Sequence, residues 1–487
     1  MIKEVQQKVA QKNASIGDEA LRQLTKLMQS SLSLRDRKKL FGKNQPSCFK
    51  SDDALSFFEK HLSVDMEGAE WLGKILLEKN VIEHESKAGV TALKKGEHFK
   101  FSNAYMPRLV IVGSGFSGMT LTKALASYFS IVLIDKLEKF STKPSYPVLL
   151  ENPDHFNKIS VDIASSVPEN VQVVKATVQS VSETGVFISE GNVPAHLIDA
   201  SHTTDTLKFI PFDFVVIATG SHALGALPTN ETGENSITYV DPYSPEGILE
   251  SIPKIDSSEN SIVLMGGGFI GIEFAGSIAH TYPQKEVVLI QRSEFIMRST
   301  SAHNAAMGVF SKYKNLKVHV NSVIDRQKDA NTLVLKTTEK EIDLKASVVF
   351  MCSGSIPNTG LLQQSFSESL EQNGLVKVNP HFQVLKANSQ PYKNIFAVGD
   401  VTNLDKEKLM QNAKYHCEKF VEIAKIIVQN QNSPLPAYEA GSRVKAATLG
   451  PKKGFIIKDD KVVFTSGMIN KMKGFLESST MSAMKKQ

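Results

Sequence analysis

The same pattern of strand, glycine-rich turn, helix and strand occurs twice in the chain, and this duplication limits the folds that the central region can adopt. In the first copy, the apolar run 109–112 leads directly into the turn GSGFSG at 113–118, and a second apolar run ends in Asp135. The second copy begins with the apolar run 261–265 and the turn GGGFIG at 266–271. Short apolar runs that alternate with helices are typical of parallel α/β units. The sequence therefore predicts an α/β fold with two Rossmann-like dinucleotide-binding domains.

The spacing of the glycines matches the needs of a bound pyrophosphate. Gly113 permits the tight turn, Gly115 lets the backbone approach the pyrophosphate, and Gly118 lets helix and strand pack closely. The pyrophosphate then accepts hydrogen bonds from amides at the positive end of the helix dipole, and Asp135 accepts them from the ribose hydroxyls. The corresponding glycines of the second copy are Gly266, Gly268 and Gly271. We therefore expect a dinucleotide at each turn.

The two copies differ at the end of their second strand. Gln291 and Arg292 stand where the first copy has the acid Asp135. A carboxylate there would repel a 2′-phosphate, whereas a neutral amide beside an arginine accommodates one. The sequence therefore predicts that the second site accepts NADPH at least as well as NADH, with assistance from Arg298. The alternative is that both arginines are solvated loop residues.

Two dinucleotides in one chain indicate hydride transfer between a tightly held flavin and an exchangeable nicotinamide. Two further segments fit this interpretation. The apolar run 214–217 leads into a turn of small residues that includes Thr219 and Gly220, and the run 394–398 ends in a Gly-Asp pair. Small residues are needed where the chain passes close to a cofactor, and Asp400 at a strand end can hydrogen-bond the ribityl chain of a flavin.

Together with residues 348–359, these landmarks resemble the two-dinucleotide-domain flavoprotein reductases over about residues 106–430. The resemblance implies that the first turn and Asp400 hold FAD, that Thr219 and Gly220 lie near it, and that Lys175 to Val178 lie near its adenine. It implies a glutathione-reductase-like fold, with the NAD(P) domain inserted between two halves of the FAD domain. The expected parts are an FAD domain at 106–240 and 356–430, an NAD(P) domain at 241–355, and a small C-terminal domain or tail at 431–487.

The cysteines distinguish this chain from the disulfide reductases of that superfamily. Cys48, Cys352 and Cys417 are the three cysteines, and their spacing cannot give a redox pair beside a flavin. Cys352 follows an apolar run and is expected to be a packing residue. The run 441–454 is similar to the apoptosis-inducing-factor-like branch, which includes the ferroptosis suppressor protein, and this resemblance implies NAD(P)H:quinone oxidoreduction. The alternative function is a redox-responsive flavoprotein of slow turnover that binds a partner.

Two side chains are candidates for the reaction centre. By family analogy, Tyr146 lines the isoalloxazine, unless it belongs to an ordinary proline-containing loop. Glu273 either approaches the nicotinamide or caps and solvates its helix. The twelve histidines show no close ligand pattern, so no metal site is expected. Apolar residues at helical spacing in the tail predict a helix that lies on a membrane or packs on the body; they are Met468, Ile469, Met472, Phe475 and Leu476.

The N-terminal region has a different pattern. Residues 1–19 are polar and are expected to be flexible, and helices are expected behind Asp18 and from about residues 51 and 66, followed by a short hairpin that ends at 101. The landmarks at 48–55, 67–77, 81–84 and 99–101 resemble a DEP domain over about residues 20–103, although residues 56–58 read SFF where many members have an apolar-Trp-Leu triplet. This resemblance implies a winged-helix-like module that binds a membrane surface or a protein partner.

Charge and hydropathy exclude other classes of protein. A net charge of +5 over 487 residues is too dilute for a protein whose main partner is nucleic acid. The sequence lacks a run of about 18 apolar residues that could span a bilayer. The first residues lack the pattern of a secretory or mitochondrial leader, so a cytoplasmic protein is expected, peripheral at a membrane surface if it binds one. The oligomeric state does not follow from the sequence.

Overall fold

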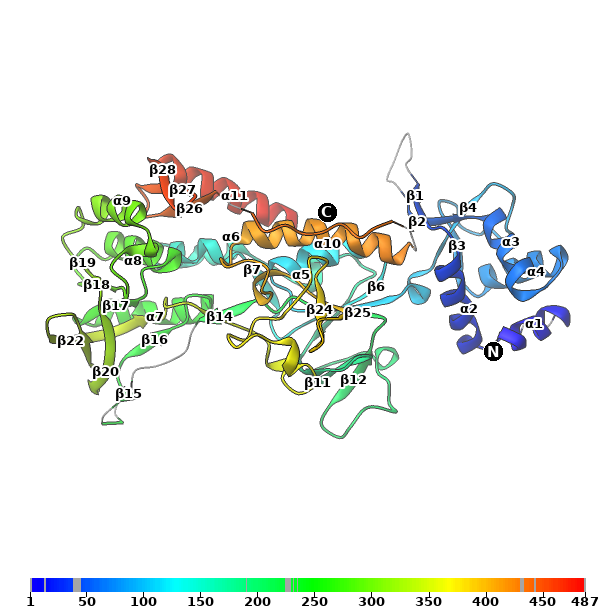
Figure 1. The fold of residues 1–487 in the computed structure, drawn as a ribbon, viewed down its shortest axis with the longest axis horizontal. Helices are drawn as coiled ribbons and strands as arrows, with labels where there is room; N and C mark the ends of the chain where they lie inside the picture. The colour runs from blue at the N-terminus through cyan, green and yellow to red at the C-terminus, as the bar shows by residue number, and fades with distance from the viewer. Residues whose placement is uncertain are drawn as a thin grey trace. The chain divides into compact units, whose positions relative to one another are not determined.

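The computed structural model describes residues 2–12, 15–37, 45–189, 191–223, 229–230, 232–233, 235–429, 433–441 and 444–485. The chain divides into two compact units, and Figure 1 labels many of their elements. The first comprises Met1–Glu138, Val167–Thr219 and Thr359–Glu439, and the second comprises Lys139–Ser166, Gly220–Asn358 and Ala440–Gln487. One glycine-rich turn lies in each unit, so each predicted dinucleotide site can be described within one unit.

A six-stranded sheet in the order β24-β25-β13-β5-β6-β9 forms the centre of the first unit. Neighbouring strands from β25 to β9 are parallel, and the edge strand β24 is antiparallel to β25. The strands are continuous apolar runs because a parallel sheet is buried on both faces. Their bounds are β5 (Arg108–Val112), β6 (Ser130–Asp135), β9 (Gln172–Lys175), β13 (Phe214–Ile217), β24 (Gln383–Leu385) and β25 (Pro391–Ala397).

Helices and a small sheet complete this part of the first unit. Helix α5 (Phe116–Leu125) follows the first glycine-rich turn, and α10 (Met410–Val428) packs against α5. A three-stranded antiparallel sheet consists of β10 (Thr177–Val181), β11 (Gly185–Ser189) and β12 (Lys208–Pro211). Its buried residues join those of the six-stranded sheet in one hydrophobic cluster. The strands, turn and helix predicted for the first copy of the repeated pattern are therefore present.

The N-terminal residues form four helices and a four-stranded sheet in the order β1-β2-β4-β3 within the described part of the chain. The predicted helices and hairpin are found. Residues 2–10, which were expected to be flexible, form a helix that buries Val5 and Val9, because these two side chains face the hydrophobic cluster of the N-terminal elements. The elements are α1 (Ile2–Ala10), α2 (Asp18–Ser31), β1 (Arg35–Arg37), β2 (Gln45–Lys50), α3 (Ser51–Leu62), α4 (Met66–Glu78), β3 (Ile82–His84) and β4 (His98–Phe101).

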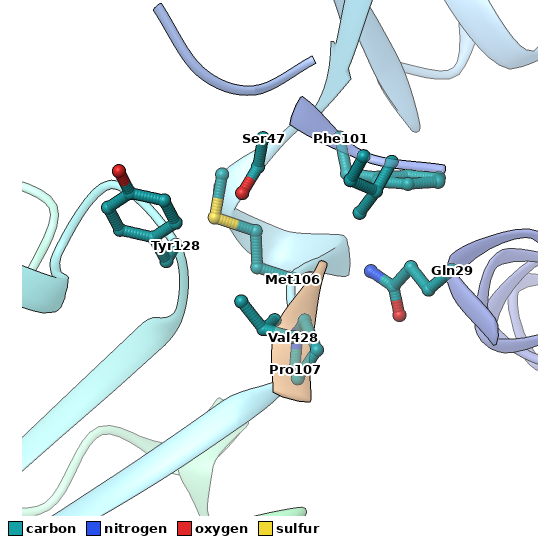
Figure 2. A pocket seen from close by; sticks show the side chains of 8 residues that line it. Gln29, Ser47, Phe101, Met106, Pro107, Tyr128 and Val428 are labelled. Carbon is teal, nitrogen blue, oxygen red and sulfur yellow. The ribbon is translucent and has the colours of Figure 1, made fainter. Parts of the chain in front are cut away.

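The N-terminal elements contact the rest of the first unit around Asp36. Its carboxylate accepts hydrogen bonds from the Tyr128 hydroxyl at 2.7 Å and from the Gln429 amide at 2.6 Å. A small, mostly apolar pocket lies beside these contacts (Figure 2), lined by Gln29, Leu34, Ser47, Phe101, Met106, Pro107, Tyr128 and Val428. Asp36 therefore links β1 to the C-terminal end of α10.

The second unit is built on an eight-stranded sheet. Strands β16, β22, β17, β18 and β19 pair in parallel, and β20 and β21 extend the sheet as an antiparallel pair. The second glycine-rich turn joins β17 to α8, as predicted. The bounds are β15 (Thr229–Asn230), β16 (Thr238–Val240), α7 (Pro245–Ser257), β17 (Ser261–Met265), α8 (Phe269–Thr281), β18 (Val287–Ile290), α9 (Thr300–Phe310), β19 (Leu316–His319), β20 (Val323–Asp329), β21 (Thr332–Lys336) and β22 (Glu341–Phe350).

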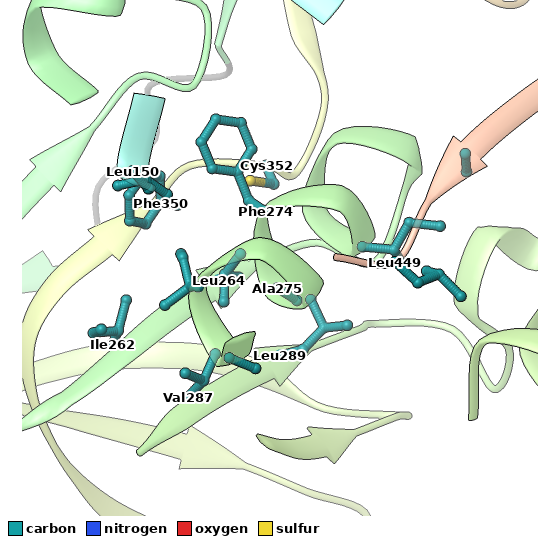
Figure 3. Packing of buried hydrophobic residues seen from close by; sticks show 14 of the residues in the cluster. Leu150, Ile262, Leu264, Phe274, Ala275, Val287, Leu289, Phe350, Cys352 and Leu449 are labelled. Atoms are coloured by element: carbon teal, nitrogen blue, oxygen red, sulfur yellow. The ribbon is translucent and has the colours of Figure 1, made fainter. Parts of the chain in front are cut away.

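Figure 3 shows part of the hydrophobic cluster that joins α8 to this sheet. The rings of Phe274 on α8 and Phe350 on β22 lie 5.2 Å apart, and both side chains are buried. Cys352 belongs to the same cluster and burial raises the pKa of its thiol. The prediction that Cys352 is a packing residue is confirmed.

The C-terminal residues of the second unit form the antiparallel sheet β26 (Lys445–Thr448), β27 (Gly454–Lys458) and β28 (Lys461–Ser466), followed by α11 (Met468–Met484). The helix predicted in the tail is therefore present. Of the run 441–454, residues 442–443 lie outside the described residues. The unit also contains β7 (Lys139–Ser141), the 3-10 segment η2 (Lys143–Leu150), β8 (Ser160–Asp162), β14 (Ser221–Ala223) and β23 (Ser355–Pro357). Among the described residues, no helix has the length and apolar character that crossing a membrane requires.

Candidate dinucleotide-binding sites

The first glycine-rich turn has the geometry of a phosphate cradle. Gly113 has a φ of +102°, and a Cβ atom there would lie 2.6 Å from the Ala218 carbonyl oxygen. A Cβ atom on Gly118 would lie 1.8 Å from the Gly113 carbonyl oxygen, so only glycine lets α5 begin this close to the turn. A Cβ atom on Gly115 would have no atom within 4 Å. This open space at the N-terminus of α5 fits a pyrophosphate held by backbone amides.

Asp135 at the end of β6 reaches back to the same turn. Its Oδ2 atom accepts from the Ser114 backbone N–H at 2.5 Å and from the Ser114 hydroxyl at 2.7 Å. Lys175 on β9 pairs in register with Asp135. The segment that begins at Lys175, which was predicted to lie near the adenine, therefore starts beside Asp135. Val178 on β10 is half-buried and packs against the cluster of the first unit. Ser114, Asp135 and Lys175 thus lie at or just after the carboxyl ends of neighbouring parallel strands, whereas Val178 belongs to the three-stranded sheet.

The segment that carries Asp400 approaches the same helix. Gly399 has a φ of +79°, and a Cβ atom there would lie 2.7 Å from the Ser117 hydroxyl of α5. The backbone before Asp400 therefore passes next to the first turn, as expected for a second flavin contact. Thr219 lies beside Gly113, whose Cβ atom would come within 3.0 Å of the Thr219 Cα. Gly220 is the first residue of the segment Gly220–Asn358 of the second unit. It has a φ of +64°, and a Cβ atom there would have no atom within 4 Å.

The second turn repeats the geometry of the first. Gly266 has a φ of +111°, and its Cβ atom would lie 2.4 Å from the Cys352 carbonyl oxygen. A Cβ atom on Gly271 would lie 1.8 Å from the Gly266 carbonyl oxygen, whereas one on Gly268 would meet nothing within 4 Å. In both units, the first and third glycines of the turn are therefore crowded, and the second glycine faces open space. The residues present at this turn also fit a dinucleotide pyrophosphate.

Gln291 and Arg292 have different surroundings. The Gln291 side-chain oxygen accepts from the Gly267 backbone N–H at 2.8 Å, and its amide nitrogen donates to Ser293. Arg292 is exposed, and so is Arg298, which has a φ of +54°. Gln291 is therefore a buried residue of the turn, and the guanidinium of Arg292 is available to a ligand phosphate or to water.

Tyr146 lies in the hydrophobic cluster of the second unit. Its ring is 3% exposed, and its hydroxyl shares a hydrogen bond of 2.6 Å with the Ser141 hydroxyl. Burial raises the pKa of Tyr146 to about 12, so the phenol is neutral at physiological pH. These contacts give Tyr146 a packing role within its unit.

Glu273 has partners that sequence reasoning did not identify. Its Oε1 atom accepts from the Thr448 backbone N–H at 3.0 Å and from the Lys473 ammonium at 2.6 Å. The carboxylate is buried and attaches β26 and α11 to α8. It neither caps nor solvates its helix. No local pattern could show this, because the partners lie 175 and 200 residues further along the chain.

His416, Asp405 and Tyr438 form a buried hydrogen-bonded group next to Gly399 that the sequence analysis missed. None of them belongs to a local motif. Within the described part of the chain, no group of three or more His, Cys, Asp and Glu side chains could hold a metal ion.

Comparison with known proteins gives consistent matches. The sequence model of the pyridine nucleotide-disulphide oxidoreductase family matches residues 107–417. Apoptosis-inducing factor homolog B of Dictyostelium discoideum is 23% identical over 372 residues, which are 71% of this chain and 88% of that protein. Ferroptosis suppressor protein 1 of Mus musculus is 25% identical over 366 residues, 71% of this chain and 87% of that protein. The predicted relationship to the apoptosis-inducing-factor-like branch is confirmed.

Solved structures share the fold at low sequence identity. The sulfide:quinone oxidoreductase of Aquifex aeolicus aligns with a TM-score of 0.62 at 18% identity, covering 77% of this chain and 92% of that one. NDH2 of Plasmodium falciparum in complex with NADH aligns with a TM-score of 0.60 at 13% identity, covering 78% and 97%. The predicted α/β fold of dinucleotide-binding oxidoreductases is confirmed.

Proposed function

Because the chain belongs to the pyridine nucleotide-disulphide oxidoreductase family, we propose that it transfers hydride from NADPH or NADH to FAD and passes the electrons to a quinone-like acceptor. The observation that carries this proposal is the pair of matching cradles, one in each unit, with open space at Gly115 and at Gly268. When bound, FAD supplies a hydride acceptor and a donor of electrons to a second substrate.

The chain's own residues bind and orient the two dinucleotides. In the first unit, the amides at the start of α5 would hold the FAD pyrophosphate. Asp135 would hold the adenosine ribose, and Asp400 would hold the ribityl chain. In the second unit, the amides at the start of α8 hold the pyrophosphate of the nicotinamide coenzyme. Positioning of this kind removes most of the entropic cost of bringing two reactants together.

A quinone-like acceptor is favoured over a disulfide substrate because the thiols are unsuitable for redox relay. Cys48, Cys352 and Cys417 are all buried, and no disulfide joins any two of them in the described part of the chain. Burial raises the pKa of the Cys352 thiol, and it raises that of Cys417 to about 12. Thiols that stay protonated are poor nucleophiles. An external acceptor therefore takes the electrons directly from the reduced cofactor.

Absorbance and turnover measurements test this function. The purified protein is expected to show a flavin spectrum, to be bleached by NAD(P)H under argon, and to consume NAD(P)H at several per second or more with a soluble quinone. A colourless protein that binds no added FAD would contradict the proposal. A protein that is reduced but turns over slowly with every quinone would favour the alternative of a redox-responsive binding protein.

The exposed apolar side chains of β28 and α11 are proposed to contact an anionic lipid surface, where a lipid-soluble quinone would be available. A patch of this kind with lysines at its border is typical of a membrane-surface helix. Lys461 and Lys471 are exposed beside it. The apolar residues and their exposed fractions are Val463 (60%), Phe464 (47%), Met468 (63%), Met472 (48%), Phe475 (74%) and Leu476 (52%).

Flotation with anionic vesicles tests this surface. The double change Phe475→Ser and Leu476→Ser is expected to lower the bound fraction about ten-fold and to leave turnover with a soluble quinone unchanged. Val148→Ser, at another partly exposed apolar residue, is the control. Equal binding by the wild type and the double variant would reject the lipid contact and leave a protein partner for this face.

The N-terminal residues, expected to be DEP-like, are proposed to determine location or partners in the cytoplasm and at the membrane surface. Both glycine-rich turns, together with Asp135 and Asp400, lie after residue 107. A chain of residues 107–487 is therefore expected to retain FAD and turnover with a soluble quinone, while the full chain shows additional binding to vesicles or to a partner protein. A folded, flavin-containing fragment without turnover would contradict this division.

A further inference from the structure

A buried imidazole contacts the backbone immediately before Asp400. The Gly399 N–H donates to the His416 Nδ1 atom at 3.1 Å, and His416 is 2% exposed. The chain has turned here from β25 into a short 3-10 segment with Gly399 at a φ of +79°. The side chain comes from the middle of α10, seventeen residues further along.

The hydrogen bonds fix the tautomer of His416. A backbone N–H can only donate, so Nδ1 must be the unprotonated acceptor and Nε2 must carry the proton. Nε2 donates to the Asp405 Oδ2 atom at 2.8 Å, and the Tyr438 hydroxyl donates to the same atom at 3.0 Å. Burial alone would raise the pKa of Asp405, but the hydrogen bonds from His416 and Tyr438 outweigh it and lower that pKa. Asp405 is therefore an ionised acceptor that orients the imidazole.

The three side chains of this group are packed among buried rings. The Phe382 ring lies 5.2 Å from the imidazole and 5.7 Å from the Tyr438 ring, and Phe382 is fully buried. Asp405 and Tyr438 are 8% and 7% exposed. Polar groups buried in this way cost free energy unless each has a partner, and a connected network can hold one arrangement firmly.

Both peptide groups that flank the Gly399 Cα are held. The N–H of the 398–399 peptide donates to His416, and the carbonyl oxygen of the 399–400 peptide accepts from the Thr402 hydroxyl at 3.0 Å. The Gly399 Cα lies so close to α5 that a Cβ atom would be 2.7 Å from the Ser117 hydroxyl. The orientation of these two peptide groups therefore sets the direction in which Asp400 leaves the backbone next to the first cradle.

We infer that His416 is a positioning residue for flavin binding: its Nδ1 atom, oriented by Asp405 and Tyr438, fixes the peptide group between residues 398 and 399 and thereby helps to place Asp400. This inference rests on the proposed FAD site. It assigns to α10 a role in cofactor binding through a backbone hydrogen bond, without contact between His416 and the cofactor.

Three substitutions of one side chain separate positioning from packing. His416→Phe keeps a ring in the cluster but removes the acceptor. His416→Asn keeps an acceptor close to the position of Nδ1, and His416→Gln keeps a polar group close to Nε2. If the hydrogen bond from the Gly399 N–H positions Asp400, His416→Phe and His416→Gln raise the dissociation constant for FAD about ten-fold or more. His416→Asn then raises it about three-fold or less.

The measurement is a titration of the flavin-free protein with FAD, followed by flavin fluorescence and absorbance, with Tyr438→Phe as a milder change in the same network. Circular dichroism and thermal unfolding serve as the check that each variant is folded. A shifted flavin absorbance band in His416→Gln that is absent in His416→Asn would support positioning, because general loosening of the core would affect both.

The outcomes are distinct. If the wild type binds no FAD, the proposed function fails. If the wild type binds FAD and all three His416 variants bind it with the wild-type constant and spectrum, the inference is wrong. If Asn and Gln weaken binding equally, His416 acts only through packing and the inference is also wrong. If His416→Phe does not fold, the comparison of Asn with Gln still decides.

Discussion

Asp135 and Gln291 occupy corresponding positions in the two units and make the same hydrogen bond. Asp135 is the last residue of the second strand of its βαβ unit, and Gln291 directly follows the second strand of the other. Each accepts the backbone N–H of the residue after the first glycine of the turn. The donors are Ser114 at 2.5 Å and Gly267 at 2.8 Å. The two cradles therefore share their geometry and differ in charge at the place where an adenosine ribose or its phosphate would bind.

This difference predicts the coenzyme preference. Changing Gln291→Glu puts a carboxylate at the ribose end of the second cradle and is expected to lower kcat/KM for NADPH at least ten-fold, because it repels the 2′-phosphate. Arg292→Ala is expected to cost NADPH use about 1.5 kcal/mol. NADH is the internal control, since it lacks that phosphate. Equal losses with both coenzymes, or a wild-type preference for NADH that Arg292→Ala leaves unchanged, would contradict this assignment.

The open glycines predict a matched pair of variants. Gly115 and Gly268 have φ values of −64° and −76° with extended ψ, so valine fits the backbone at either position. Gly115→Val is expected to abolish FAD retention. Gly268→Val is expected to retain FAD but to lose bleaching by NADPH, since each side chain blocks one pyrophosphate. Flavin absorbance measures both effects.

Gly308→Val is the control for this pair, because Gly308 also has nothing within 4 Å of its Cβ position. Loss of flavin from the Gly268 variant as well would show that the substitution disturbs folding rather than one site.

The Glu273–Lys473 ion pair predicts a stability effect in the second unit. Lys473→Met leaves a buried carboxylate without its cation and is expected to lower the free energy of unfolding by about 2–4 kcal/mol. Adding Glu273→Gln should recover part of this loss, because a neutral amide costs less to bury. Urea unfolding followed by circular dichroism measures the change. Lys452→Met, at an exposed lysine, should have no effect; a loss of the same size there would show that the ion pair is not responsible.

The buried thiols predict resistance to alkylation. Because the pKa of Cys417 is raised to about 12 and that of Cys352 is also raised, both thiols remain protonated at pH 8. Native protein treated with iodoacetamide at pH 8 should therefore stay unmodified at these two positions in a mass spectrum, and both should react after unfolding in guanidinium. Rapid modification of either in the native state would show that its surroundings are open.

Contacts between residues that are close in the sequence could be predicted, and contacts between residues far apart in the sequence could not. The two turns could be predicted because their glycines act on atoms a few residues away or on the next strand. Asp135 and Gln291 could be predicted from a spacing within one βαβ unit. The partners of Glu273 could not, because Thr448 and Lys473 come from a different part of the chain.

Helix α1 and Tyr146 show the limits of local sequence patterns. Helix α1 buries only Val5 and Val9, and a few apolar residues in a short, otherwise polar segment give too weak a pattern to predict a helix. Tyr146 was expected by family analogy to line a flavin, with an ordinary proline-containing loop as the alternative. The structure places its ring in a hydrophobic cluster, and the same sequence pattern fits both environments.

The second unit is formed by three separate segments of the sequence, and this limits how early it can fold during translation. One hydrophobic cluster contains Leu149 and Ile159, the strands of the central sheet, and Leu449 and Phe455 near the end of the chain. A chain emerging from the ribosome can therefore bury the first of these residues completely only after the last have been made. The first unit is released earlier, because its last segment ends at Glu439. We expect the apolar surface of residues 139–166 to remain exposed during most of translation, which makes this segment the place where a chaperone would bind the nascent chain.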